Sequence, residues 1–326
     1  MNKSSTKTVQ LNDGLDDLFV FVDHNSFESE KITAPRYSYW KSVGRVFFKK
    51  KSNWFFMILF VVLIALAIFW PIVSQYDMVS NVTVTNGHHL TPSAASALYG
   101  SDFKWILGAD QYGGSTWDSL WLGTRTSLLL ALICTAINMT IGVVLGAVWG
   151  LSKKFDAVMT QVFNIIGNVP FILLITVFMY VLGRGFFSLV VALTVTGWLG
   201  IAYFIRTQVI IIRDREYNLA SRCLGTNILT IVFKNILPFL ISVIVTILAS
   251  ELPSYISYEV YLSYIGIGLT AKDISIGRLI SDSQGNFLIY PWEFWPPVII
   301  SGIVSIVLYV LGQSIGDASD PRTHMA

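Results

Sequence analysis

The chain has 326 residues, a formal net charge of +2, 54% hydrophobic residues and only 13% charged residues. Its mean hydropathy is +0.62. These values exclude an ordinary soluble globular domain, in which charged residues make up about a quarter of the chain. The composition therefore predicts an integral membrane protein.

A helix needs about 20 predominantly apolar residues to cross roughly 30 Å of hydrocarbon. Six runs approach that length: 54–73, 128–151, 162–182, 188–205, 236–264 with a break near Pro253, and 294–311. Pro170 is expected to kink or break the third run, and Pro253 is expected to break the fifth. The sequence thus predicts an all-α bundle of six transmembrane helices.

The distribution of lysine and arginine predicts the orientation, because the cytoplasmic side of short loops retains these residues. The clearest cluster precedes the first run and consists of Arg36, Lys41, Arg45, Lys49, Lys50 and Lys51. Alternation from this point places both termini in the cytoplasm. Arg125, just before the second run, then falls at the outer interface, where we expect it to snorkel; a contact with substrate is the alternative.

The hydrophobic runs also predict the domain organisation. We expect a cytoplasmic N-terminal arm at 1–53, a first transmembrane helix at 54–73, an extracellular segment at 74–126, a five-helix core at 127–312 with a cytoplasmic loop at about 206–236, and a cytoplasmic tail at 313–326.

Motifs for catalysis or cofactor binding do not occur in this sequence. There is no G-x-x-x-x-G-K-[ST] phosphate loop, so we expect no ATP binding by that motif. His88 and His89 are adjacent rather than four residues apart, which is the spacing of a helical metal pair, and we interpret them as exposed loop residues. We expect no catalytic residue, no metal and no cofactor in the chain itself.

Five polar residues near or within the runs are candidates for lining a translocation path: Glu251, Glu259, Asn138, Asn164 and Asn168. A carboxylate at the bilayer centre costs about 2.5–3.5 kcal/mol on insertion scales, so each glutamate should face protein or a water-filled cavity. The alternative is structural, with hydrogen-bonded carboxylates at a subunit interface and amides bound to a neighbouring helix. The residues alone leave both readings open.

The segment 216–238, EYNLASRCLGTNILTIVFKNILP, is a mixed polar and apolar stretch between two hydrophobic runs. It predicts a short helix that ends at Gly225 and a second helix that Pro238 closes or bends. Ala220 and Ser221 are small enough to let a partner surface approach closely. The segment either docks a partner or packs as a helical hairpin on its own bundle.

This segment resembles the cytoplasmic loop of the inner-membrane permeases of ATP-binding-cassette importers, E-A-A-x-x-x-G-x(9)-I-x-L-P. Ala220, Gly225 and the pair Leu237 and Pro238 match at the family spacing. Three positions depart from the pattern, namely Leu219 for the Glu, Ser221 for the second Ala and Asn235 for the Ile. Glu216, about one turn earlier, is the candidate to replace the missing acid.

Further segments resemble the C-type permeases of the dipeptide and oligopeptide importers. They are LGADQYGGSTWDSLWLGTRTSL at 107–128, YEVYLSYIGIGL at 258–269 and DASDPR at 317–322. Ala109, Gly114 and Ser115 depart from the first of these family patterns. The resemblance covers about residues 40–322 and is most similar to the permeases of streptococci and related Gram-positive bacteria.

The resemblance implies a type I importer permease bundle, crossing a bacterial cell membrane several times. It implies three kinds of protein partner: a homologous second permease, two ATPase subunits that bind ATP and Mg, and an extracellular peptide-binding protein. The cargo would be peptide, the surroundings would be membrane lipid, and no nucleic acid would be bound. The residues it implies for coupling to an ATPase are Glu216, Ala220, Ser221, Arg222, Gly225, Leu237 and Pro238. The chain would not itself be an enzyme; it would form half of the translocation path.

Two alternatives remain at this point. The same C-type motifs occur in permeases for nickel or another small solute, so the cargo is open. A secondary transporter or a membrane sensor that works without an ATPase is the alternative from another class. Copurification of an ATPase separates a secondary transporter or sensor from both permease readings, the one for peptides and the one for nickel or another small solute.

Overall fold

The computed structural model describes three stretches of the chain, which are residues 38–74, 87–270 and 272–320, without the side chain of Ile228. Contacts divide the chain into two units, residues 1–39 and 40–326, and the second unit holds nearly all of the described residues. Within them every regular element is a helix, apart from one isolated bridge between Ala109 and Ser115. The expected all-α fold is confirmed.

Parts of the expected domain organisation lie outside the described residues. These parts are most of the arm at 1–53, the stretch 75–86 of the external segment, and the end of the tail at 313–326.

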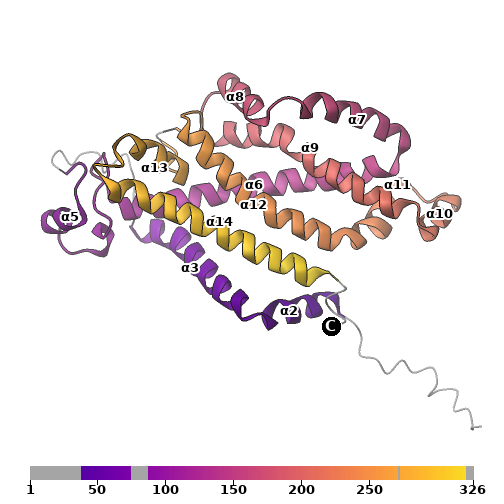
Figure 1. Ribbon diagram of the computed structural model, residues 1–326, viewed down its shortest axis with the longest axis horizontal. Coiled ribbons are helices and arrows are strands. Elements are labelled where there is room, and N and C mark those ends of the chain that lie inside the picture. Colours follow the sequence, from indigo (N-terminus) through magenta and orange to yellow (C-terminus); the bar gives the residue numbers. More distant parts are fainter. Residues whose placement is uncertain (1–37, 75–86, 271, 321–326) are drawn as a thin grey trace, which may run out of the picture. The chain divides into compact units, whose positions relative to one another are not determined.

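The helices are, in chain order and with the labels of Figure 1, α2 (Tyr39–Lys49), α3 (Lys51–Ser74), α5 (Pro92–Tyr99), η2 (Phe103–Trp105), α6 (Thr116–Leu151), α7 (Lys153–Gly167), α8 (Phe171–Leu182), α9 (Phe186–Arg213), α10 (Glu216–Cys223), α11 (Ile228–Ile231), η3 (Val232–Ile236), η4 (Leu237–Leu240), α12 (Ile241–Tyr264), α13 (Ile276–Ser283), η5 (Gln284–Asn286) and α14 (Pro291–Ser319).

Five helical stretches in the described part of the chain are long and apolar enough to cross a membrane: Lys51–Ser74, Thr116–Leu151, Phe186–Arg213, Leu229–Tyr264 and Pro291–Ser319. The pair α7 and α8 passes the same test when taken together, but its two helices are bent by 80° at the break between them. The structure therefore has five such helices, or six if the bent pair counts as one.

The third run, expected at 162–182 with a kink or a break at Pro170, is broken there. Helix α7 ends at Gly167, and α8 begins at Phe171 directly after Pro170. Proline has no amide hydrogen, and its ring disfavours helical backbone at the preceding residue, so a helix that enters this position stops before it.

The fifth run is irregular at a different place from the one expected. Helix α12 continues through Pro253, whereas the expectation was a break there. The irregular part comes earlier, where a π-helix (η3) and a 3-10 helix (η4) join α11 to α12. Pro238 lies in the first turn of η4, where a missing amide hydrogen costs little. Prolines inside membrane helices are tolerated where neighbouring groups satisfy the freed carbonyl.

The central contact of the bundle joins α6 to α9 through glycine. A Cβ added at Gly142 would lie 2.7 Å from the Cβ of Ile201, and one at Gly150 would lie 2.7 Å from the Cβ of Val209. A Cβ at Gly146 would overlap the backbone of Ala202. The two backbones can approach this closely only because α6 has no side chains along this line.

The remaining helices pack around this pair. Helix α12 packs against α6 and α14, and α3 packs against the same two helices. One buried apolar cluster draws its members from α6, α9 and the segment 231–240, so the second half of the 216–238 segment belongs to the core. Figure 1 shows α10 at one end of the long helices, and α5 and α13 at the other.

We expect the substitution Gly146→Leu to weaken the contact between α6 and α9, because the new side chain meets backbone that cannot move aside. Overpacking of this kind costs about 1–3 kcal/mol or more. The midpoint of thermal unfolding of the detergent-purified protein should fall. Gly302→Ala in α14 is the matched control, since a Cβ there meets nothing within 4 Å. Equal midpoints for the two variants would show that the glycine contact is not needed.

Candidate functional site

The 216–238 segment folds as a hairpin that amide side chains hold together. Asn218 is fully buried, and its Nδ2 donates to the carbonyl of Ile212 at the end of α9, at 3.1 Å. Asn235 Nδ2 donates to Asn218 Oδ1 and to Ser221 Oγ, both at 3.2 Å. Asn235 therefore ties the second half of the hairpin to α10. In the sequence Asn235 stands out only as a departure from the family pattern, and no local pattern marks Asn218.

The expected end of the short helix at Gly225 is confirmed. Thr226 N donates to Ser221 O, and Gly225 N donates to Arg222 O, which together form a Schellman motif. Gly225 has a φ of +75°, a conformation that favours glycine. The motif stops α10 and turns the chain back toward the bundle.

The hairpin is two-sided. Its inner side holds the buried Asn218, and Leu237 packs against the apolar core of the bundle. The opposite face of α10 carries Glu216, Leu219 and Ala220, all exposed, at helical spacing. The exposed fractions are 45% for Leu219 and 85% for Leu224, which follows α10. Packing on its own bundle thus accounts for one side of the hairpin and leaves the other side open.

A half-buried ion pair fixes the base from which the hairpin extends. Arg206 of α9 binds Asp156 of α7 with both its Nε and its Nη2, the latter at 3.0 Å from Oδ2. Trp149 Nε1 of α6 donates to the same carboxylate at 2.8 Å. Two-pronged pairing by a guanidinium fixes orientation as well as distance. Three helices are therefore locked together about two turns before α9 reaches α10.

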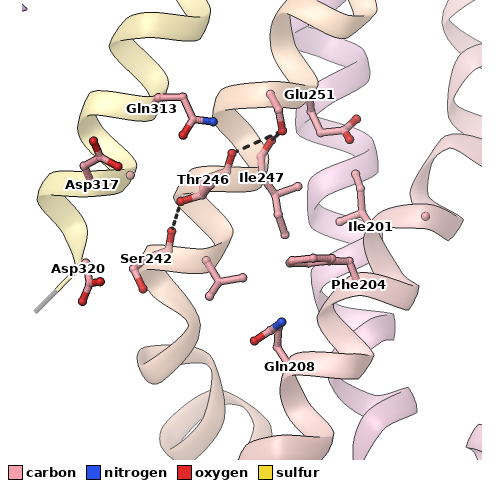
Figure 2. Close-up of a pocket in the computed structure, with 14 residues that line it drawn as sticks. Ile201, Phe204, Gln208, Ser242, Thr246, Ile247, Glu251, Gln313, Asp317 and Asp320 are labelled. Atoms are coloured by element: carbon pink, nitrogen blue, oxygen red, sulfur yellow. Dashed lines mark hydrogen bonds between the residues drawn. The ribbon is translucent and has the colours of Figure 1, made fainter. Parts of the chain in front are cut away.

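Of the five residues expected along a path, Glu251 lines a large cavity. The cavity measures about 570 Å³ and lies between α9, α12 and α14 (Figure 2). Its polar lining residues are Gln208, Ser242, Thr246, Ser250, Glu251, Gln313, Asp317 and Asp320. In Figure 2 the labelled polar side chains come from all three helices and lie beside apolar ones such as Ile201 and Phe204, so polar and apolar groups share the wall of the cavity.

Glu259 occupies a different environment, because it is fully buried and bound by serines. Ser275 Oγ and Ser263 Oγ donate to its Oε1 at 2.5 and 3.0 Å, and Ser127 Oγ donates to its Oε2 at 2.8 Å. The amide of Ile276 in turn donates to Ser127 Oγ at 3.1 Å. These bonds join α12, α6 and the start of α13 within the chain, so the Glu259 carboxylate holds three elements together.

The three asparagines also separate. Asn138 is fully buried, and its Nδ2 donates to Tyr255 Oη of α12 at 2.6 Å and to Leu193 O of α9 at 3.3 Å. Asn164 and Asn168 are exposed near the end of α7, where the Asn168 side chain bonds the Asn164 carbonyl. Neither group is brought to the cavity that Glu251 lines, so the structure does not gather the five candidates in one place.

The other end of the bundle carries its own buried acids. His89 Nδ1 lies 2.7 Å from Glu293 Oε1, and its ring stacks on Tyr290 at 4.0 Å, so His89 is not the free loop residue expected. Burial raises the pKa of the Asp110 and Asp282 carboxyls above their usual range. Within the described residues no three His, Cys, Asp or Glu side chains are placed to hold a metal ion.

We expect Gly225→Ala to loosen the hairpin, because an L residue in this conformation costs about 1–2 kcal/mol. Amide exchange in residues 216–227 should accelerate roughly 5–30-fold, the factor that corresponds to one or two kcal/mol. Gly44→Ala is the control, since neither glycine has an atom within 4 Å of the added Cβ and only Gly225 has a positive φ. Unchanged exchange in Gly225→Ala would contradict the role of the Schellman motif.

We expect Glu259→Ala to detach α13, because three serine hydroxyls lose their acceptor. Each buried polar group left unsatisfied costs about 1–3 kcal/mol. Thermal unfolding of the purified protein should begin at a lower temperature, and a protease should cut near α13 sooner. Ser257→Ala in the same helix removes only a bond to its own helix, to Pro253 O, and should change neither measurement.

Comparisons with known proteins agree with this architecture. Residues 138–325 match the family described as "Binding-protein-dependent transport system inner membrane component". Residues 38–92 match the family described as "N-terminal TM domain of oligopeptide transport permease C". The two matches together cover most of the chain.

Relatives and a solved structure point the same way. The chain is 46% identical to the oligopeptide transport system permease protein AmiD of Streptococcus pneumoniae, over 94% of this chain and 97% of the relative. It is 31% identical to the oligopeptide transport system permease protein OppC of Bacillus subtilis, over 91% and 94%. A chain of the MetNI methionine ABC transporter in an inward-facing conformation has the same fold, with a TM-score of 0.52 and 19% identity over 62% of this chain and 96% of that one.

The resemblance that the loop and the C-type motifs indicated is therefore confirmed. The family consists of transport permeases rather than ATPases, and its members cross the membrane several times. The chain belongs to the family of binding-protein-dependent transport system inner membrane components.

Proposed function

We propose that the chain is one permease subunit of an ATP-driven importer of oligopeptides. It pairs with a homologous second permease, receives peptide from an extracellular binding protein, and is driven by two separate ATPase subunits that bind ATP and Mg. Oligopeptide permeases of the same size that share 31% and 46% of its residues support the cargo.

The observation that carries the coupling role is the two-sided hairpin. Its inner side is fixed by Asn218 and Asn235, while Leu219 and Ala220 face outward with no cover in the described part of the chain. A docked ATPase would cover this outer face. Force on the face would pass to α9, because α10 is tied by Asn218 to the last turn of α9 and α9 is tied by Arg206 to α7.

Leu219 stands where the family has a glutamate. The docking in this chain therefore depends on apolar contact and close fit rather than on an ion pair between that glutamate and the ATPase. The exposed side chains of Leu219 and Leu224 supply apolar area, and the small side chain of Ala220 lets the ATPase surface approach closely. Glu216 at the start of α10 is the charged group available to a basic ATPase surface.

The topology supports six crossings with both termini on the ATPase side. Gly142 and Gly150 of α6 meet Ile201 and Val209 of α9 in the same order, so the two helices run parallel. Two parallel membrane helices need a crossing in the opposite direction between them in the chain. The bent pair α7 and α8, which lies between α6 and α9 in the sequence, would supply it. Lys50 Nζ, just before α3, lies 3.3 Å from Asp317 Oδ2 near the end of α14. The start of α3 and the end of α14 therefore lie on the same side of the bundle.

The cavity lined by Glu251 is the part of the chain best suited to the path. Its hydroxyl, amide and carboxylate groups come from α9, α12 and α14 and would satisfy a peptide backbone without selecting its side chains. Glu259, Asn138, Asn164 and Asn168 would then act on the path only indirectly, through the packing of the helices that carry them.

We expect Ala220→Arg to lower ATP-dependent oligopeptide uptake at least tenfold, because a guanidinium pressed into an apolar contact is desolvated without a partner. Uptake of labelled peptide into membrane vesicles measures it, and the amount of ATPase that copurifies should fall in parallel. Ala97→Arg is the control, since Ala97 is equally exposed but lies on α5 at the other end of the bundle.

Normal uptake by the Ala220→Arg protein would refute the coupling role. The cargo is tested separately in the unaltered protein, where excess unlabelled oligopeptide should abolish uptake and nickel should not. The reverse pattern would leave the permease role standing and replace the cargo by a metal ion. Failure of any ATPase to copurify with the unaltered chain would refute an ATP-driven importer.

A further inference from the structure

A second cavity lies on the surface of the bundle and differs in kind from the first. It measures about 370 Å³ and lies between α3, α6, α12 and α14. Its lining is apolar apart from one arginine and consists of Phe60, Ile64, Ala67, Ile68, Arg125, Leu128, Leu129, Leu132, Leu252 and Leu308. We call it the Arg125 groove.

Arg125 belongs to the same helix face as the leucines of α6. Residues 125, 128, 129 and 132 have the i, i+3, i+4, i+7 spacing of one face, so the guanidinium stands at one end of an apolar strip. Arg125 is exposed, and in the part of the chain that the structure describes it forms no hydrogen bond and no ion pair. The charge has no counter-ion from the described residues.

The position of Arg125 along α6 matches the level of lipid headgroups. From Arg125 to Leu151 at the end of α6 is about 26 residues, or roughly 39 Å of helix. A bilayer including its headgroup regions is about 40–45 Å thick. Lys153 and Lys154 follow α6 directly and mark the opposite headgroup region. Arg125 therefore lies among the headgroups of the leaflet at the α13 end.

The groove extends from this level toward the middle of the membrane. Leu252 lies midway along α12, and Leu308 lies in the second half of α14. Ile68 and Phe60 of α3 form the opposite wall over about two turns. The positive charge at the headgroup level complements the phosphate of a phospholipid, and the apolar slot beneath it complements an acyl chain.

We propose that the Arg125 groove binds one anionic phospholipid of the leaflet at the α13 end, with its phosphate on Arg125 and one acyl chain in the slot. A guanidinium binds phosphate oxygens with two parallel hydrogen bonds, which suits this partner. The volume is that of a small-ligand site, within the range of about 300–1,000 Å³. A transmembrane helix from a second permease, about 10 Å across, exceeds such a slot and brings no phosphate.

A bound lipid would brace α3 against the rest of the bundle. Helix α3 contacts only α6 and α14 extensively, and many of its apolar side chains are exposed. An acyl chain between Ile64 on one side and Leu129 on the other would add contacts that the protein alone does not make. This role is independent of the cargo and of the coupling hairpin.

The test uses the whole complex, purified with its partner subunits in mild detergent and supplied with phosphatidylglycerol. Native mass spectrometry should show one phosphatidylglycerol retained per copy of this chain. Arg125→Gln should lower the retained fraction at least fivefold, while Arg184→Gln, at an exposed arginine of the loop between α8 and α9, should leave it unchanged. Equal retention in these two variants would overturn the proposal.

The apolar half of the site is tested with the charge left in place. Leu132→Trp should fill the slot and displace the lipid, whereas Leu173→Trp, at a position of α8 exposed to 57% against 55% for Leu132, should not. A phosphate-free diglucosyl diacylglycerol should not compete, and inorganic phosphate should not displace the lipid. Competition by either would overturn the assignment, as would efficient cross-linking of a Leu129→Cys protein to the second permease.

Discussion

The close approach of α6 and α9 is the contact on which the rest of the structure depends. In lipid there is no hydrophobic force to drive helices together, so association rests on packing, and small residues permit it. Gly142, Gly146 and Gly150 provide a line along α6 where the backbone of α9 can lie. Helix α9 continues from this contact to the 216–238 hairpin, and α6 extends in the other direction to Ser127 and Arg125. Both ends of the molecule are thus attached to one rigid pair.

Polar groups inside the bundle serve mainly to fix helices against one another. Glu259 gathers three serine hydroxyls from three elements, Asn138 joins α6 to α12, and Asp156 joins α7 to α9. Hydrogen bonds of this kind between helices favour one arrangement of the bundle. The cavity beside Glu251 differs, because polar side chains from α9, α12 and α14 line a space of about 570 Å³.

The three places to which the proposals assign a role lie apart in the bundle. The exposed face of the hairpin lies at one end, the cavity lined by Glu251 lies between α9, α12 and α14, and the Arg125 groove lies between α3, α6, α12 and α14. The two cavities share only α12 and α14, and the residues that line one do not line the other. Glu251 and Leu252 are consecutive residues of α12 that line different cavities.

The membrane class, the positions of most spans, the end of α10 at Gly225 and the family all follow from the sequence, because run length, turn residues and motif spacing are local properties. The tertiary structure decided what local patterns do not contain. Pro170 breaks its helix while Pro253 does not, although both are prolines in apolar runs. Asn235 holds the two halves of the hairpin together through a hydrogen bond to Asn218. Glu251 lines a cavity, whereas Glu259 is buried among serine hydroxyls. A residue type determines which bonds a side chain can form, but the partner comes from a distant part of the chain, and only folding brings it near.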